Sequence, residues 1–224
     1  MDPQQFVITA DGSKTIYHPV FKEHYHSVNG ALQESRHVFI EAGLKYVAEK
    51  TGSREIRVLE VGLGTGLNFL LSADYCKSHA ISLRYCGVEA YPLSLKTIAV
   101  TGYQEYVDTR TWKDFLFAYE PAMKQEIELS PGICLTIRHQ QVQDYKTGLS
   151  FDLIYFDAFA SASQPEMWSA DILGHVIRML KPGGVFVTYA VNAGLKKTLL
   201  DLGCHLEKLP GAAGKREMLR ASVA

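Results

Sequence analysis

From residue 55 onward, short apolar runs alternate with stretches of helical spacing, and this alternation constrains the fold more than any other feature. The apolar runs lie at about 56–61, 83–89, 133–138, 151–157 and 184–190. Several of them are almost continuously apolar, which is typical of strands that are covered on both faces. The helical stretches lie near 66–79, 92–101, 109–120 and 165–180. Strand–helix alternation of this kind predicts an α/β fold with a parallel, doubly wound sheet.

Both ends of the chain depart from this alternation. Near the N-terminus, Asp11-Gly12 separates two short β-prone runs and predicts a hairpin, and helical spacing follows over 31–50. Near the C-terminus, a helix at 192–202 precedes two short strands, near 204–209 and 216–222, that can close as a hairpin. We therefore expect a seven-stranded, mostly parallel sheet with an antiparallel final strand and an N-terminal hairpin and helix.

The length of 224 residues predicts a single domain, 1–224, in which 1–50 extend a Rossmann-like core at 55–224. The 23 basic and 24 acidic residues nearly cancel, so any contact with RNA requires a local basic patch. The first residues are polar, and no run approaches the ~18–20 apolar residues that span a bilayer. We expect a soluble, cytoplasmic protein. The four cysteines show no metal-binding spacing, so we expect no metal.

A glycine-rich turn follows the first parallel strand, where residues 60–68 read EVGLGTGLN. A dinucleotide fingerprint, G-x-G-x-x-G, would need glycine at position 67, which is leucine. The spacing is G-x-G-x-G instead, which favours S-adenosyl-L-methionine over NAD. Glu89 ends the second strand and suits an acid that accepts hydrogen bonds from ribose hydroxyls. The candidate cofactor-binding residues of these two strand ends are Glu60, Gly62, Gly64, Thr65, Gly66, Asn68 and Glu89. A purely structural turn and a solvated acid are the alternatives.

The E-x-G-x-G-T-G pattern resembles motif I of the class I S-adenosyl-L-methionine-dependent methyltransferases. Further blocks, spread over nearly the whole chain, narrow the resemblance. They are Asp11-Gly12-Ser13, Tyr25-His26-Ser27, 34–39 (ESRHVF), 64–69 (GTGLNF), 89–93 (EAYPL), 156–159 (FDAF), 165–168 (PEMW) and 214–219 (GKREML). In this order, they resemble the methyltransferase half of the MnmC-type enzymes of tRNA wobble-uridine modification.

This resemblance implies methyl transfer from S-adenosyl-L-methionine to the primary amine of 5-aminomethyl-(2-thio)uridine at tRNA position 34. The product would be the 5-methylaminomethyl form. The flavin-dependent oxidase half of the fused enzymes has no counterpart in 224 residues, so we expect a stand-alone methyltransferase. The implied partner is tRNA carrying 5-aminomethyluridine at the wobble position, with no membrane contact. The oligomeric state stays open.

Asp157 is the candidate catalytic residue. It ends the strand at 151–157, at the sheet edge where open α/β sheets place their sites. The methylated amine must be unprotonated, and an alkyl amine is mostly protonated near neutral pH, so a nearby proton acceptor is useful. Asp157 could take that proton or only position the amine. Alternatively, it caps the next turn.

Four further residues follow these strands. Related methyltransferases usually carry an acid near the adenine amino group, and Gln141 occupies that position, with Asp144 as a substitute. The amide oxygen of Gln141 could still accept the hydrogen bond. Pro165 and Trp168 form a block that starts a helix, and they are candidates for substrate contact. For Trp168 the alternative is a core residue, which is the more common role of a tryptophan in such a block.

The remaining substrate-binding candidates come from the two ends of the chain. Tyr25 and His26 could close over the cofactor as an N-terminal flap, or they could be ordinary surface residues. Lys215 and Arg216 lie in the closing hairpin and could contact RNA phosphates.

Other functions remain open at this stage. A class I methyltransferase or aminopropyl transferase could act on another amine. A module could bind S-adenosyl-L-methionine or RNA without turnover, and an NAD-dependent dehydrogenase is the most distant alternative. A pyrimidine methyltransferase with a cysteine nucleophile is disfavoured, because no cysteine lies in the expected Pro-Cys loop.

Overall fold

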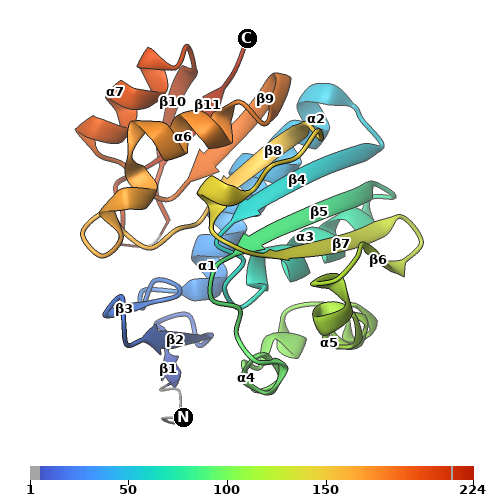
Figure 1. The fold of residues 1–224 in the computed structure, drawn as a ribbon. Helices are drawn as coiled ribbons and strands as arrows, with labels where there is room; N and C mark the ends of the chain where they lie inside the picture. Colours follow the sequence, from blue (N-terminus) through green and yellow to red (C-terminus); the bar gives the residue numbers. More distant parts are fainter. Residues whose placement is uncertain (1–5, 213) are drawn as a thin grey trace.

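The computed structural model describes residues 6–212 and 214–224, so the first five residues of the polar N-terminal stretch lie outside it. Over these residues the chain forms an eight-stranded sheet in the order β10-β11-β9-β8-β4-β5-β7-β6 (Figure 1). The strands are β4 (Glu55–Val61), β5 (Ser82–Glu89), β6 (Ile127–Ser130), β7 (Ile133–His139), β8 (Phe151–Phe156), β9 (Leu180–Thr188), β10 (His205–Pro210) and β11 (Glu217–Ser222). The five central strands pair in parallel, which confirms the α/β fold class.

The sheet has one strand more than the sequence predicts. The extra strand, β6, pairs antiparallel with β7 across a turn at Pro131-Gly132. β6 is four residues long and none of them is fully buried, so it lacks the apolar run that marks the central strands. At the opposite edge, β11 pairs antiparallel with β9, and β10 with β11. Both edges are therefore antiparallel, whereas we expected this only of the final strand.

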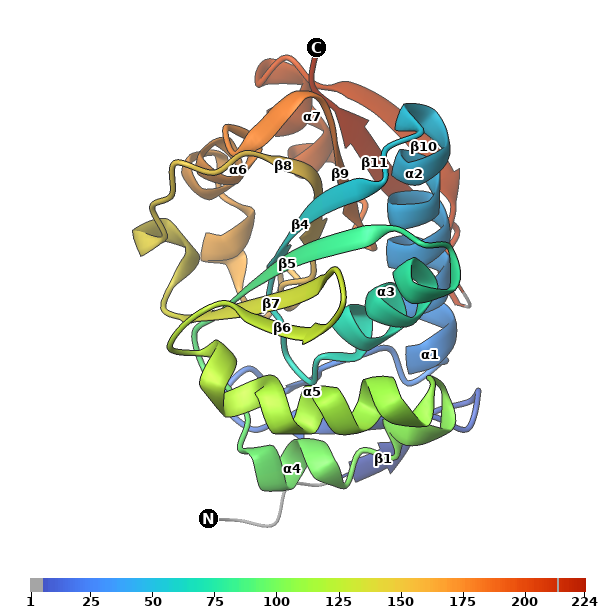
Figure 2. The same cartoon turned by 90° about the vertical axis from the view of Figure 1, so that its right-hand side faces the viewer.

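Helices cover both faces of the sheet (Figure 2). One face carries a continuous N-terminal helix, made of α1 (Ala31–Glu34), a π-helical stretch at Ser35–Lys45 and α2 (Tyr46–Thr51), together with α3 (Leu67–Ser78) and α5 (Thr109–Ala122). The other face carries α6 (Ala170–Ile177) and α7 (Ala193–Asp201). The shorter helices are α4 (Leu95–Ala99) and the 3₁₀ turns Tyr103–Glu105, Val142–Asp144 and Pro165–Trp168. None of the helices in the described residues is long and apolar enough to span a membrane.

Two hydrophobic cores lie on the two faces of the sheet, and β8 contributes to both. Leu153 and Tyr155 belong to the core under the N-terminal helix, while Ile154 and Phe156 belong to the core under α6 and α7. All four side chains are completely buried. Successive side chains of a strand point to opposite faces, so a strand buried on both faces needs an apolar residue at every position. This explains the continuous apolar run that ends at Asp157.

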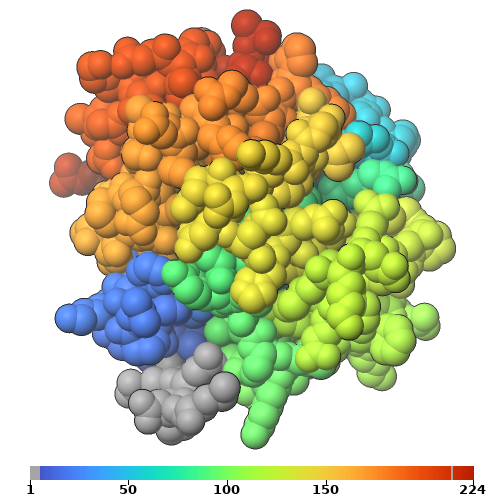
Figure 3. Space-filling view, viewed as in Figure 1, coloured from blue at the N-terminus to red at the C-terminus, as the bar shows by residue number. Residues whose placement is uncertain are grey.

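The N-terminal segment forms a small three-stranded antiparallel sheet, β1 (Phe6–Ile8), β2 (Lys14–His18) and β3 (Glu23–His24), with the expected turn at Asp11-Gly12. The Asp11 carboxylate accepts hydrogen bonds from the hydroxyls of Thr9 and Ser13 and from the backbone N–H of Gln33. These hydrogen bonds outweigh partial burial and lower the pKa of Asp11 to about 2. The hairpin is thereby fixed to the start of α1. It lies beneath the carboxyl ends of β4 and β5, packed against the rest of the chain (Figures 1 and 3).

Candidate active site

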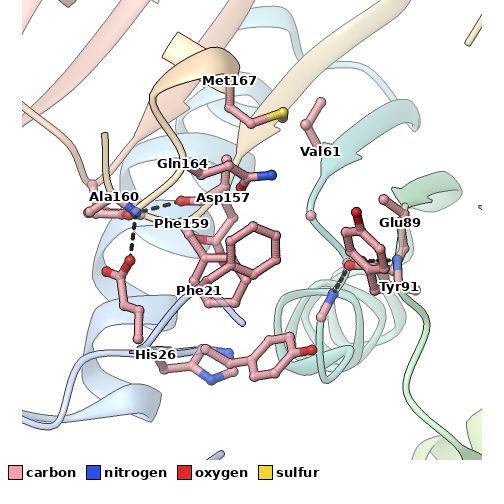
Figure 4. Close-up of a pocket in the computed structure, with 18 of the residues that line it drawn as sticks. Phe21, His26, Val61, Glu89, Tyr91, Asp157, Phe159, Ala160, Gln164 and Met167 are labelled. Carbon is pink, nitrogen blue, oxygen red and sulfur yellow. Dashed lines mark hydrogen bonds between the residues drawn. The ribbon is translucent and has the colours of Figure 1, made fainter. Parts of the chain in front are cut away.

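A cavity of about 380 Å³ opens at the carboxyl ends of β4, β5 and β8 (Figure 4). Doubly wound sheets bind their ligands at this edge, because the loops after neighbouring strands diverge there. The N-terminal segment closes the cavity from below. Residues 140–142 after β7, Tyr189 after β9 and Lys215 after β10 complete the wall. Of the residues predicted from the sequence, the cavity wall contains Tyr25, His26, Gly62, Gly64, Glu89, Gln141, Asp157 and Lys215.

The three glycines of the turn have different tasks. A Cβ on Gly62 would lie 2.5 Å from the carbonyl oxygen of Asp157, so this glycine lets the β4 and β8 loops pass each other. A Cβ on Gly64 would lie 3.0 Å from the ring of Tyr25, on the cavity wall. A Cβ on Gly66 would lie 2.5 Å from the ring of Phe115, behind the turn. Gly62 and Gly64 can therefore approach a ligand, whereas Gly66 is required for packing.

Glu89 braces the glycine turn from the neighbouring strand. Its two carboxylate oxygens accept hydrogen bonds from the backbone N–H groups of Gly64 and Tyr91, each at 2.8 Å (Figure 4). Burial raises the pKa of Glu89, although these hydrogen bonds oppose the shift. Each oxygen retains a lone pair. A ligand hydroxyl in the cavity can therefore donate to this carboxylate.

Asp157 lies on the cavity wall directly after β8. The side-chain amide of Asn68 donates to Oδ2 of Asp157 at 2.8 Å. Burial raises the pKa of Asp157 to about 8, and the negative charge of Glu34 adds to this shift, while Asn68 and the charge of Lys215 oppose it. A carboxyl with this pKa can hold or release a proton near neutral pH, as a general acid or base must.

Glu60 and Asn68 support Asp157 from beneath. Glu60 is completely buried and does not lie on the cavity wall. Its carboxyl accepts hydrogen bonds from the amide of Asn68 and the hydroxyl of Tyr85, both at 2.8 Å. Burial raises its pKa well above the usual range, and the charge of Asp157 adds to the shift. Where the sequence suggested contact with the cofactor for Glu60 and Asn68, the geometry is that of a support for Asp157.

The N-terminal segment is tied to the glycine turn. The ring of Tyr25 lies against Gly64, and the buried ring of His26 places Nε2 at 3.4 Å from the hydroxyl of Thr65. Burial lowers the pKa of His26 to about 4, so this ring is neutral at pH 7. Thr65 also accepts a hydrogen bond from the hydroxyl of Tyr103, and it lies behind the cavity wall. Tyr25 and His26 are thus wall residues, whereas Thr65 anchors them.

Three predicted substrate residues lie away from the wall. Trp168 is nearly buried, packs edge-on against Phe156, and donates its indole N–H to the carbonyl of Phe159 at 2.8 Å. This is the geometry of a core residue that fixes the loop after β8. Pro165 starts the adjacent 3₁₀ turn and is exposed. Arg216 is exposed and borders a shallow depression beside the cavity.

An aromatic cluster at the cavity was not predicted from the sequence. Its members are His18, Phe21, Tyr25, Tyr91 and Phe159. The rings of Phe21 and Phe159 are 4.8 Å apart at their centroids and tilted by 31° (Figure 4). All but His18 lie on the cavity wall, and Tyr91 is 53% exposed. The His/Tyr-rich composition of residues 17–26 was the available signal.

The cavity also contains charged residues that the sequence did not bring together. Glu34, at the end of α1, forms an ion pair with Lys215. The Lys215 ammonium lies 3.8 Å from the centroid of the Tyr189 ring. With Glu23, Glu89 and Asp157, the described wall carries four carboxyl groups and one lysine. Such a wall favours a cationic ligand. Among the described residues, no cluster of His, Cys, Asp and Glu could hold a metal ion.

Comparison with known proteins gives the family. Residues 109–224 match the family described as "S-adenosyl-L-methionine-dependent methyltransferase". The chain belongs to this family. It therefore uses S-adenosyl-L-methionine as its cofactor, which confirms the interpretation that the spacing of the glycine turn favoured over NAD.

Similar full-length proteins narrow the relationship. The chain is 35% identical over 212 residues to the "tRNA 5-methylaminomethyl-2-thiouridine biosynthesis bifunctional protein MnmC" of Leptospira borgpetersenii, an alignment that covers 89% of this chain and 32% of that protein. It is 29% identical over 229 residues to the protein of the same name from Aromatoleum aromaticum, covering 98% and 35%. The predicted resemblance to the MnmC-type methyltransferases is confirmed. The chain spans about a third of the length of these relatives.

A solved structure confirms the fold. The crystal structure of MNMC2 from Aquifex aeolicus superimposes with a TM-score of 0.83 at 23% identity, covering 100% of this chain and 71% of that one. Because the whole of this chain is covered, the likeness includes the N-terminal hairpin and helix as well as the central sheet.

Proposed function

We propose that this methyltransferase transfers a methyl group to the primary amine of 5-aminomethyl-(2-thio)uridine at position 34 of tRNA, giving the 5-methylaminomethyl form. The observation that carries the proposal is Asp157, a carboxyl with a pKa of about 8 on the wall of an acid-rich cavity in a methyltransferase fold. The names of the relatives, which refer to 5-methylaminomethyl-2-thiouridine in tRNA, support the choice of substrate.

One part of the cavity suits the cofactor. At Gly64 a Cβ would already press on Tyr25, so only glycine leaves room for a ligand against the backbone. We assign Gly62 and Gly64 to the amino-acid part of S-adenosyl-L-methionine, Glu89 to its ribose hydroxyls and Gln141 to its adenine. The bound cofactor supplies an electrophilic methyl group on a sulfonium, and the carboxyl-rich wall suits that positive charge.

The other part suits the amine. A primary amine attacks a methyl group only through its lone pair, so the ammonium form must lose a proton first. We assign this proton to Oδ1 of Asp157, because Asn68 already binds Oδ2. The carboxyl holds the nitrogen in place through the same contact, and alignment of the reacting atoms contributes much of the acceleration.

The aromatic cluster suits the nucleotide. RNA-binding proteins stack unpaired bases on aromatic side chains. Phe21 and Phe159 lie on the cavity wall beside Asp157, and we propose that they contact the target uracil. Arg216 is exposed near the cavity and is assigned to a phosphate. Pro165 and Trp168 act indirectly by shaping the loop that carries Phe159. A tRNA substrate would place the reaction in the cytoplasm.

We further propose that the chain is one methyltransferase domain and that its N-terminal extension, 1–50, contributes side chains to the active site. Tyr25, His26 and Glu34 all come from this extension and all lie on the cavity wall. Without these three residues, the cavity would lack the wall that faces the glycine turn.

The decisive experiment uses methyl-labelled S-adenosyl-L-methionine and two tRNAs, one with 5-aminomethyluridine at position 34 and one with plain uridine. We expect label only on the amine-bearing tRNA. Asp157→Asn should reduce methyl transfer at least ~100-fold, the usual contribution of a general base, with little change in cofactor affinity. Label on neither tRNA, together with label on small amines, would assign the enzyme to another amine. Equal activity of the Asn variant would remove Asp157 from the reaction.

A further inference from the structure

Lys215 is the one lysine or arginine on the wall of the cavity within the described residues. Its side chain is 31% exposed and reaches from the loop between β10 and β11 to the end of α1, where it pairs with the nearly buried Glu34. Its ammonium also lies over the face of Tyr189 at 3.8 Å. A carboxylate together with an aromatic face is a favourable environment for an ammonium ion.

The two groups that hold this ammonium are fixed without it. The backbone N–H of Ser27 donates to Oε1 of Glu34 at 3.4 Å, and Lys215 uses the other oxygen. The hydroxyl of Tyr189 donates to the carbonyl of Ala158 at 2.9 Å, which fixes the ring beside the loop that carries Asp157. The Glu34 carboxylate and the Tyr189 ring are thus held in place by other contacts, and Lys215 binds between them without being needed to position them.

The end of a lysine side chain has the same chemistry as the proposed substrate, a primary ammonium on a CH₂ group. Glu34, Tyr189, Lys215 and Asp157 all lie on the same cavity wall. The charge of Glu34 raises the pKa of Asp157 and that of Lys215 lowers it, so these three groups lie close enough to interact. If a ligand ammonium replaced the Lys215 ammonium between Glu34 and Tyr189, the net charge at this place would not change.

We propose that Glu34 and Tyr189, beside Asp157, form a binding subsite for a primary ammonium group, that Lys215 fills this subsite in the free enzyme, and that the substrate's aminomethyl group displaces it. The identity of the substrate amine rests on the proposed function, whereas the subsite does not. The displaced lysine would join Arg216 on the exposed loop, where both could contact phosphates of the bound tRNA.

The test empties the subsite and offers it a small ammonium ion. In Lys215→Ala, n-butylammonium should bind and raise the melting temperature by roughly 3–6 °C at ten times its dissociation constant. The wild-type protein should show no such rise, because its own lysine competes. The control variant Lys197→Ala, which lacks an exposed lysine on α7, should likewise show no rise in melting temperature. Butyrate and tetramethylammonium control for the alkyl chain and for charge without N–H donors.

Adding Glu34→Gln to Lys215→Ala should abolish the response. Equal shifts in the wild type and in Lys215→Ala, or no shift in the latter, would overturn the proposal. Neither S-adenosyl-L-methionine nor tRNA is present, so this outcome is separate from the fate of the proposed function.

A second measurement uses the unmodified chain, in case Lys215→Ala does not fold. Acetylation of Lys215 by a water-soluble ester, followed by mass spectrometry, should be slow in the free enzyme. It should accelerate several-fold when the nucleoside 5-aminomethyluridine is added together with S-adenosyl-L-homocysteine. Plain uridine is the control. Unchanged or slower acetylation would mean that this nucleoside does not displace the lysine, and it would contradict the displacement step. The response to n-butylammonium tests the subsite itself.

Discussion

Replacing Asp157 by asparagine should make the protein more stable, and the gain can be worked out from the pKa of this residue. An aspartate in an unfolded chain has a pKa of about 3.9. In the folded chain, burial and Glu34 raise the pKa of Asp157 to about 8. At pH 7 the folded protein therefore holds a proton that the unfolded chain has released. Between about pH 3.9 and pH 7, the folded state loses about 1.36 kcal/mol of stability for each pH unit. Over about three pH units, the free energy of unfolding therefore falls by about 4 kcal/mol relative to its value at low pH.

The direction of this pH dependence follows from the raised pKa. The contribution of protonated Asp157 to stability is complete below about pH 4, falls as the pH rises, and is lost once the pH passes about 8. An asparagine stays neutral and can still accept the hydrogen bond from Asn68. We expect Asp157→Asn to raise the free energy of unfolding by about 2–4 kcal/mol at pH 7. The lower end of this range allows for the attraction between Lys215 and the ionised fraction of Asp157, which the variant loses.

Urea unfolding between about pH 5 and pH 9 measures this difference. The gap between the two proteins should widen by up to ~1.4 kcal/mol per pH unit and level off above about pH 8. The matched control is Asp201→Asn on α7, an exposed carboxylate whose loss should change stability by less than ~0.5 kcal/mol. If the difference in free energy of unfolding did not change with pH, or if the Asn variant were less stable at every pH, this prediction would be refuted. Asp157 would then not be a carboxyl that stays protonated in the folded protein at pH 7.

Two further predictions concern the cavity. Gly64→Ala should reduce the affinity for S-adenosyl-L-methionine at least ~10-fold by calorimetry, since the added methyl would lie 3.0 Å from Tyr25. Gly52 also has a positive φ but faces open space, so Gly52→Ala should leave this affinity unchanged. Glu34→Gln should move the rising limb of the pH profile of kcat/KM from about pH 8 to lower pH, because a charge that raises the pKa of Asp157 is gone; an unmoved limb would show that another group controls it.

The parts of the site that the sequence predicts are those that a strand end determines. Glu89 ends a parallel strand, and Gly64 and Asp157 follow parallel strands. Parallel strands bring their carboxyl ends to one edge of the sheet, whatever the conformation of the loops. The strands themselves were recognisable because burial on both faces demands continuous apolar runs. β6 was not predicted from the sequence, because an edge strand of four partly exposed residues has no continuous apolar run.

The rest of the site depends on contacts between distant segments. Glu34 and Lys215 are 181 residues apart, and only the folded chain shows that they form a pair inside the cavity. The sequence therefore suggested a phosphate contact for Lys215, as for any lysine in an exposed hairpin. Glu60 shows a different limit of sequence reasoning, because a motif marks which residues belong together but not which of them face the ligand. The structure buries Glu60 beneath Asn68 and leaves the cavity to Asp157.

The charges of the cavity impose a requirement that links the extension to the reaction. A carboxyl group is a useful proton acceptor near neutral pH only if its surroundings raise its pKa from the usual range toward 7. Burial at the end of β8 supplies most of that shift for Asp157, and Glu34 supplies a further part. Glu34 belongs to α1, which the Asp11 hydrogen bonds hold beside the hairpin. The N-terminal segment therefore does more than cover the cavity, because it carries one of the charges that adjust Asp157 to its proposed task.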